Sequence, residues 1–154
     1  MPASETDRQR IVELLITAYH AELETVMNYI ANAVNLDGVR AEEIKAALQA
    51  DVAEELTHAQ TIARRIKTLG GSVPGSMAMT MTQSTAQPPA SSTDVVAVIK
   101  GVIDAEDSAI AGYEEIIRAT DGIDYVTQDL AITLLGDEEE HRRQFMVFLK
   151  EYES

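Results

Sequence analysis

Glu55-Leu56-Thr57-His58 and Glu138-Glu139-Glu140-His141 are two copies of one pattern, and each copy completes a longer repeat. Glu22 stands 33 residues before Glu55, and Glu106 stands 32 residues before Glu138. A tyrosine follows each of these leading glutamates at seven residues, at Tyr29 and Tyr113. Residues three apart share one face of a helix, so each Glu-x-x-His segment presents a carboxylate and an imidazole together. The chain is therefore predicted to contain the same helical hairpin twice.

Apolar residues recur every three or four positions in four long stretches, which is the spacing of an amphipathic helix. The predicted helices cover about residues 7–35, 40–69, 93–119 and 124–152. Turns that contain glycine separate them, and Ser92 or Thr93 is expected to cap the third helix. No stretch of the sequence alternates with period two. Residues 1–154 are therefore predicted to form one all-α domain, a four-helix bundle.

The segment 70–92 is rich in Gly, Pro, Ser and Thr and is predicted to be a linker that sustains no long helix. A connection of this length can travel the whole length of a bundle, so the helices before and after it are expected to point the same way. Its three methionines are Met77, Met79 and Met81. They are expected to fill gaps at the end of the core, with copper binding or reaction with oxidants as the alternatives.

Acids and histidines interrupt the apolar stripes at one place on each predicted helix. These residues are Glu22, Glu55, His58, Glu106, Glu138 and His141. One Glu-x-x-His segment arises by chance on any acidic helix, but a doubled pattern in phase with four stripes predicts a metal site. Two divalent cations would balance four carboxylate charges, which would otherwise repel one another in a dry core. Most of the neighbouring acids, which are Glu54, Asp137, Glu139 and Glu140, are expected to be solvated.

The composition restricts the partners of the chain. Twelve Lys and Arg oppose 26 Asp and Glu, which gives a net charge of -14, and such a surface repels nucleic-acid phosphates and anionic bilayers. Cations are the expected partners, and neither nucleic acid nor a membrane is. Cys is absent, and mixed oxygen and nitrogen ligands suit iron or manganese. The N-terminal residues are polar and no apolar run approaches about 18 residues, so the protein is expected to be cytoplasmic.

These motifs resemble those of the ferritin-like superfamily, nearest to bacterioferritin and its Dps-like relatives. The resemblance covers nearly the whole chain and is carried by Glu22-Leu23, Tyr29, residues 55–58, residues 65–71, Glu106, residues 124–129 and residues 137–141. It implies that Glu22 and His58 hold one iron. Glu106 and His141 would hold the second, Glu55 and Glu138 would bridge the two, and Tyr29 and Tyr113 would lie next to the ligands. The family oxidises Fe(II) with dioxygen or peroxide, and many members store ferric mineral in a hollow shell.

Two departures from bacterioferritin shape the expected cofactor and assembly. Leu56 stands where bacterioferritins carry a methionine that ligates an inter-subunit haem, so no haem is expected. The chain ends 13 residues after His141, without the short fifth helix that makes four-fold contacts in the 24-subunit shell. A homodimer is therefore the expected minimal unit, and a 12-subunit shell is favoured over one of 24. Three residues of the first helix are expected to face a partner subunit: Tyr19, Met27 and Ile30.

A ferroxidase with two iron ions per subunit, for iron storage or detoxification, is the favoured function. The alternative is a rubrerythrin-like peroxidase with two iron or two manganese ions that forms no mineral. Such a peroxidase would need a separate reductase, because a chain without Cys holds no rubredoxin-type electron donor. A degenerate bundle or a DNA-protecting particle is a third reading, and the net charge disfavours DNA binding. His20 is expected to be a surface or interface residue, with a ligand at the entrance for iron as the alternative.

Overall fold

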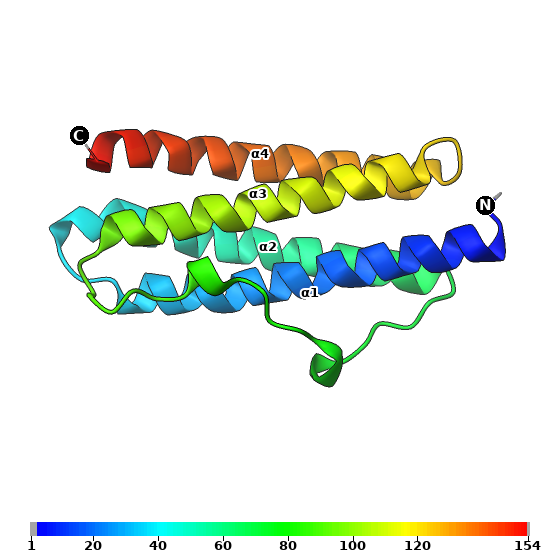
Figure 1. The fold of residues 1–154 in the computed structure, drawn as a ribbon, viewed down its shortest axis with the longest axis horizontal. Coiled ribbons are helices and arrows are strands. Elements are labelled where there is room, and N and C mark those ends of the chain that lie inside the picture. The colour runs from blue at the N-terminus through cyan, green and yellow to red at the C-terminus, as the bar shows by residue number, and fades with distance from the viewer. Residues whose placement is uncertain (1–2, 154) are drawn as a thin grey trace.

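The computed structural model describes residues 3–153, which form four long helices and no strand. The helices are α1 (Glu5–Asn35), α2 (Glu42–Thr68), α3 (Val95–Thr120) and α4 (Tyr125–Glu153). They pack side by side as a bundle (Figure 1), which confirms the predicted fold class. None of the helices within residues 3–153 combines the length and the apolar character that a membrane crossing requires.

The ends of the helices follow local hydrogen bonding. The Ser4 side chain accepts a hydrogen bond from the Asp7 N–H, so α1 begins at Glu5. The prediction that Ser92 or Thr93 caps α3 is wrong, because the carboxylate of Asp94 accepts from the Ala97 N–H at 3.1 Å. A 3-10 turn, η1 (Val39–Ala41), delays the start of α2 to Glu42.

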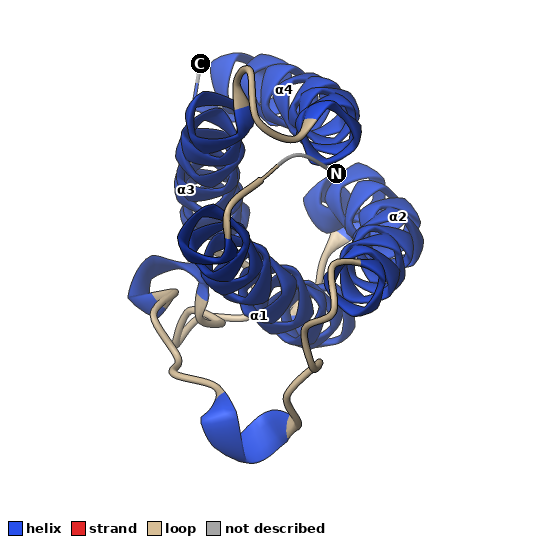
Figure 2. Ribbon diagram, turned by 90° about the vertical axis from the view of Figure 1, so that its right-hand side faces the viewer, coloured by secondary structure: helices blue, strands red, loops and turns tan. Residues whose placement is uncertain are grey.

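The four helices form two antiparallel hairpins, α1–α2 and α3–α4, joined by the crossover, residues 70–94. The crossover returns along the full length of the bundle on the side of α1 and α3, so α2 and α3 point the same way (Figures 1 and 2). It contains two short 3-10 turns, η2 (Ser76–Ala78) and η3 (Ser84–Ala86). This path leaves the α2–α4 side of the bundle without a covering segment.

Polar side chains of α1 hold the second part of the crossover. Glu24 is buried, and its carboxylate accepts hydrogen bonds from the backbone N–H groups of Thr82 and Gln83, at 3.0 and 2.8 Å. On the other side, a Cβ on Gly101 of α3 would lie 2.4 Å from the Thr85 carbonyl oxygen. Only glycine allows the crossover to lie this close to α3.

The expectation that the linker methionines fill the end of the core is wrong. Met77 is 99% exposed and Met81 is 53% exposed, while Met79 is partly buried. The crossover runs along the side of the bundle instead of over its end, and η2 projects outward from it (Figure 2). Met77 therefore lies too far out to reach the apolar interior.

Two apolar clusters fill the bundle. One contains Ile44, Leu48, Ile99 and Phe145, and the other contains Leu15, Ile62, Ile116 and Leu134. The residues of each helix that fall between these clusters in sequence include the acids and histidines that interrupt the stripes. The two clusters thus place a polar layer near the middle of the bundle, with dry packing on both sides of it.

Candidate metal centre

Six predicted residues converge in this polar layer. Glu22 lies on α1, Glu55 and His58 on α2, Glu106 on α3, and Glu138 and His141 on α4. Each of the six is between 1% and 4% exposed. The helical spacing explains the arrangement, because the glutamate and histidine of each Glu-x-x-His segment are three residues apart and point the same way.

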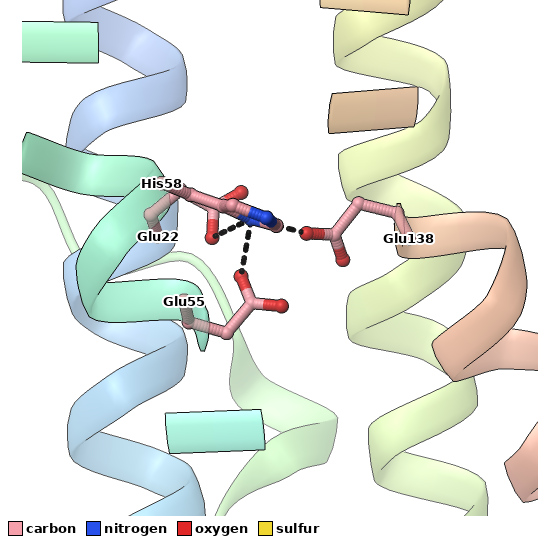
Figure 3. A group of neighbouring side chains, drawn as sticks. All are labelled: Glu22, Glu55, His58 and Glu138. Carbon is pink, nitrogen blue, oxygen red and sulfur yellow. Dashed lines mark ion pairs between the residues drawn. The ribbon is translucent and has the colours of Figure 1, made fainter. Parts of the chain in front are cut away.

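The imidazole of His58 lies among three carboxylates (Figure 3). Its Nδ1 is 3.0 Å from Oε1 of Glu138, 3.6 Å from Oε2 of Glu22 and 3.7 Å from Oε2 of Glu55. One oxygen or nitrogen from each of these four residues falls within 4.8 Å of the others, a spacing that a single metal ion can span.

The second histidine has a matching environment. Nδ1 of His141 is 3.0 Å from Oε1 of Glu55, 3.7 Å from Oε2 of Glu138 and 3.8 Å from Oε1 of Glu106. Glu55 and Glu138 therefore offer one oxygen toward each histidine. The two imidazole rings lie 6.4 Å apart at an interplanar angle of 22°. The result is a pair of adjacent four-residue clusters that share two glutamates.

Two buried tyrosines connect the hairpins. The Tyr29 hydroxyl of α1 donates to Oε1 of Glu106 on α3 at 2.7 Å, and the Tyr113 hydroxyl of α3 donates to Oε1 of Glu22 on α1. Burial, together with the nearby carboxylates, raises the pKa of both phenols well above the ordinary value. Both tyrosines therefore stay neutral and act as hydrogen-bond donors that orient a carboxylate of the opposite hairpin.

A further layer of acids lies behind the histidines, and sequence reasoning missed it. Nε2 of His58 is 2.9 Å from Asp137, and Nε2 of His141 is 2.8 Å from Glu54 and 3.5 Å from Asp51. The expectation that most of these neighbouring acids are merely solvated does not hold for Glu54 and Asp137, although their side chains are 43% and 41% exposed. Each precedes a shared glutamate directly in sequence, and that position is the signal that could have identified them. Glu139 and Glu140 are exposed, as expected.

The outer acids fix which ring nitrogen faces the centre. A carboxylate at Nε2 favours a proton on that nitrogen, which leaves Nδ1 free to donate a lone pair inward. This is the arrangement in which histidine binds a metal ion.

When the cluster contains no metal, bound protons reduce the repulsion among its carboxylates. Burial opposes a charged imidazolium, but the carboxylates of Glu138 and Glu55 outweigh it and raise the pKa of His58 to about 10. The pKa of His141 is raised further, because Glu106, Glu138 and Glu55 outweigh its burial. Burial and the neighbouring Glu138 raise the pKa of Glu106 to about 8. At neutral pH these three groups carry protons that a cation would displace.

The donor atoms are placed to bind a metal ion rather than to form hydrogen bonds with one another. Six buried atoms, one from each predicted residue, have no well-directed hydrogen-bond partner: Glu22 Oε2, Glu55 Oε1, His58 Nδ1, Glu106 Oε2, Glu138 Oε1 and His141 Nδ1. Buried polar atoms are rarely left in this way. Four carboxylates and two imidazoles are the donor set of carboxylate-bridged iron sites in four-helix bundles, and the two clusters fit iron binding.

Other residues singled out in the sequence lie outside the clusters. His20 is partly buried, with its ring 5.6 Å from that of Tyr19, and belongs to neither four-residue cluster. Met27 and Ile30 are 60% and 46% exposed, whereas Tyr19 packs partly buried against the core of its own chain.

Comparisons with known proteins agree with this geometry. Residues 12–154 match the sequence profile of the family described as a ferritin-like domain. The chain is 32% identical over 142 residues to the DNA protection during starvation protein of Pyrococcus furiosus, across 90% of this chain and 76% of that protein.

Solved structures share the fold. A ferritin-like, diiron-carboxylate protein from Bacillus anthracis superposes with a TM-score of 0.82 at 19% identity, covering 95% of this chain and 99% of the other. A dodecameric thioferritin, the bacterioferritin-related protein of Bacteroides fragilis, gives 0.82 at 24% identity and covers 98% and 89%. With its fold, its clusters and the profile match over residues 12–154, the chain belongs to the family of ferritin-like domains.

Proposed function

We propose that this protein is a ferroxidase that binds two Fe(II) ions per subunit and oxidises them for storage or detoxification. The observation that carries the proposal is the set of six buried donor atoms without a well-directed hydrogen bond, which converge from all four helices. Four carboxylates balance the charge of two divalent ions, and two neutral imidazoles complete the two positions.

The ligand assignment follows the two clusters. Glu22 and His58 would hold one iron, and Glu106 and His141 would hold the other. Glu55 and Glu138 would bridge them, since each offers an oxygen toward both histidines. Tyr29 and Tyr113 would keep the two terminal glutamates in place, and Asp137 and Glu54 would orient the imidazoles.

The reaction balances with either oxidant. Two Fe(II) ions give up one electron each, and dioxygen takes these two electrons and two protons to become hydrogen peroxide. With hydrogen peroxide as the oxidant, the two electrons and two protons give two water molecules. The protons displaced from His58, His141 and Glu106 by the incoming cations are available close to the reacting atoms.

Three measurements test the proposal: the extent of Fe(II) oxidation, the melting temperature with Mn(II), and the protons released when Mn(II) binds. Aerobic titration with Fe(II) should show oxidation that continues far beyond two ions per subunit. Oxidation that stops at two would favour the second candidate, a rubrerythrin-like peroxidase with iron or manganese. Anaerobic Mn(II) should raise the melting temperature of the protein. Binding of Mn(II) should also release protons at pH 7, which calorimetry in buffers of different ionisation enthalpy measures. A melting curve that saturating Mn(II) leaves unchanged would contradict a preformed site.

The assembly belongs to the same proposal. The Bacteroides fragilis protein is a dodecamer by its description, which supports a 12-subunit shell built from homodimers. The exposed Met27 and Ile30 on α1 offer one apolar contact. The Pyrococcus furiosus relative is named for DNA protection. With a net charge of -14, this chain would protect DNA by removing Fe(II) and peroxide rather than by binding phosphates.

A further inference from the structure

A pocket of about 230 Å³ lies between α1, α3 and the crossover, and it reaches the candidate metal centre. Glu22, which is 3% exposed and belongs to the His58 cluster, is part of its wall. Asp104 of α3 is also part of the wall and is exposed to solvent. The pocket thus connects the surface with a buried carboxylate that has one oxygen, Oε2, without a hydrogen-bond partner.

The chemistry of the wall suits a small cation. Thr17, Thr25 and Ser108, which carry hydroxyl groups, also line the pocket, and no Lys or Arg is among the described residues that line it. The Asp104 side chain makes no hydrogen bond or ion pair within residues 3–153, so its carboxylate is available to a ligand. Hydroxyl and carboxylate oxygens can replace the water molecules of a divalent cation one at a time, and the negative charges attract it.

The wall is built into the fold. Glu24 anchors Thr82 and Gln83 of the crossover, and the Gln83 side chain donates to Oγ1 of Thr25 at 2.7 Å. The absence of a side chain at Gly101 lets the crossover lie against α3 next to the pocket. The crossover is therefore held in place as one side of the opening.

The α2–α4 side offers a different kind of surface. Glu54 and Asp137 are partly exposed there, but each of their carboxylates is already engaged with Nε2 of a histidine. A cation that approached from that side would have to displace these contacts. On the α1–α3 side, the Asp104 side chain is unengaged within residues 3–153, and Glu22 keeps one oxygen, Oε2, without a hydrogen bond while its other oxygen accepts from Tyr113.

We propose that the pocket between α1, α3 and the crossover is the entrance through which Fe(II) reaches the centre, with Asp104 as its outer cation site. This inference rests on the proposed ferroxidase function. The Asp104 carboxylate attracts Fe(II) to the opening. The ion then exchanges bound water molecules for the hydroxyl oxygens of the wall and binds to Glu22. Neutral oxidants need no such carboxylate, so the pocket distinguishes the cation from its co-substrate.

Two pairs of variants test the entrance. Asp104→Asn removes the outer charge, and its matched control, Glu114→Gln, removes an exposed charge of α3 that does not line the pocket. Ser108→Leu narrows the pocket without touching a cluster residue, and Ala111→Leu, its control, adds a leucine at an exposed position of α3 that does not line the pocket. Melting temperatures of the assembled proteins establish that all four variants fold.

Two readouts distinguish the rate at which Fe(II) enters from the affinity of the centre: the initial rate of Fe(II) oxidation and the equilibrium binding of Mn(II). We expect Asp104→Asn to lower the initial rate of oxidation at sub-saturating Fe(II) by roughly 3- to 10-fold at low salt, with a smaller deficit at high salt. Ser108→Leu should slow loading by more than about 10-fold. Equilibrium binding of Mn(II) should stay within about twofold of wild type in both variants, because the ligands are intact. Both controls should load at the wild-type rate.

Wild-type loading rates in both Asp104→Asn and Ser108→Leu would overturn this inference. Slow loading in Glu54→Gln and Asp137→Asn alone would place the entrance on the α2–α4 side and would overturn it as well. The proposed function fails by a separate result, namely that the unmodified protein neither binds two Mn(II) ions per subunit nor oxidises Fe(II).

Discussion

The α1–α2 and α3–α4 hairpins contribute the same side chains to the centre but surround them differently. Among the described residues, Nε2 of His58 forms an ion pair with Asp137 and has Glu54 nearby, whereas Nε2 of His141 forms ion pairs with two acids, Glu54 and the buried Asp51. Asp51 stands four residues before Glu55, and the corresponding position in the second hairpin is Leu134. The donor set is therefore two-fold symmetric, but the charge around it is not. The two metal positions should differ in affinity although their ligands match.

The shared glutamates should show the largest effect, because they belong to both halves. In the proposed assignment, Glu55→Ala or Glu138→Ala removes a ligand from both metals at once, so we expect initial Fe(II) oxidation to fall by about 100-fold or more. Stopped-flow absorbance at sub-saturating iron measures this rate, and Glu139→Ala, an exposed neighbour, is the control. Wild-type rates in both bridge variants would contradict the assignment.

The histidine variants should separate the halves. His58→Ala and His141→Ala should each weaken one of the two Mn(II) equivalents, by roughly 10- to 100-fold. The equivalent that remains in His58→Ala keeps the more acidic surroundings of His141, so it should bind more tightly than the one that remains in His141→Ala. Anaerobic calorimetry measures both. Equal residual affinities would show that Asp51 does not distinguish the positions.

The tyrosines should affect the two halves alike. Tyr29→Phe and Tyr113→Phe each remove one hydroxyl that donates to a buried carboxylate of the opposite hairpin. We expect each to lower the free energy of unfolding by about 1 to 3 kcal/mol. Urea denaturation measures this loss, with Tyr125→Phe as a control at a tyrosine that is 67% exposed. A loss in one variant alone would mean that the crossed pairs are not equivalent.

The smallest effect should come from Asp51 itself. Burial raises its pKa to about 7 in the metal-free protein, while the charge of His141 opposes that rise. An acid whose pKa is raised on folding binds more protons in the folded state, so the stability of the wild type falls as pH rises from about 4 to 7. Asp51→Asn should therefore be more stable than wild type at pH 8, by about 1 to 2 kcal/mol, with a smaller difference at pH 5. Chemical denaturation at the two pH values measures it, and a less stable variant at pH 8 would contradict the argument.

Sequence periodicity was sufficient to predict the four helices and the six central residues. Glu22 and its counterparts stand inside apolar stripes, where a buried polar group is unusual and indicates a ligand or a partner. Periodicity was insufficient for Asp51, Glu54 and Asp137. These acids lie at the edge of the stripes, and only the distance between α2 and α4 decides whether they reach a histidine. The path of the crossover was beyond prediction as well. Glu24 looks like one more acid on an acidic helix until its contacts with Thr82 and Gln83 are known.

The crossed pairing of Tyr29 with Glu106 and of Tyr113 with Glu22 has a consequence for the order of folding. Contacts within each hairpin are local in sequence, so each hairpin can form early, whereas these two pairs join residues 77 and 91 positions apart. Neither hairpin alone holds a complete cluster, since each cluster takes residues from both. The centre can therefore be completed only once the two hairpins have docked, and a hairpin that has formed alone lacks a complete set of donor atoms for a metal ion.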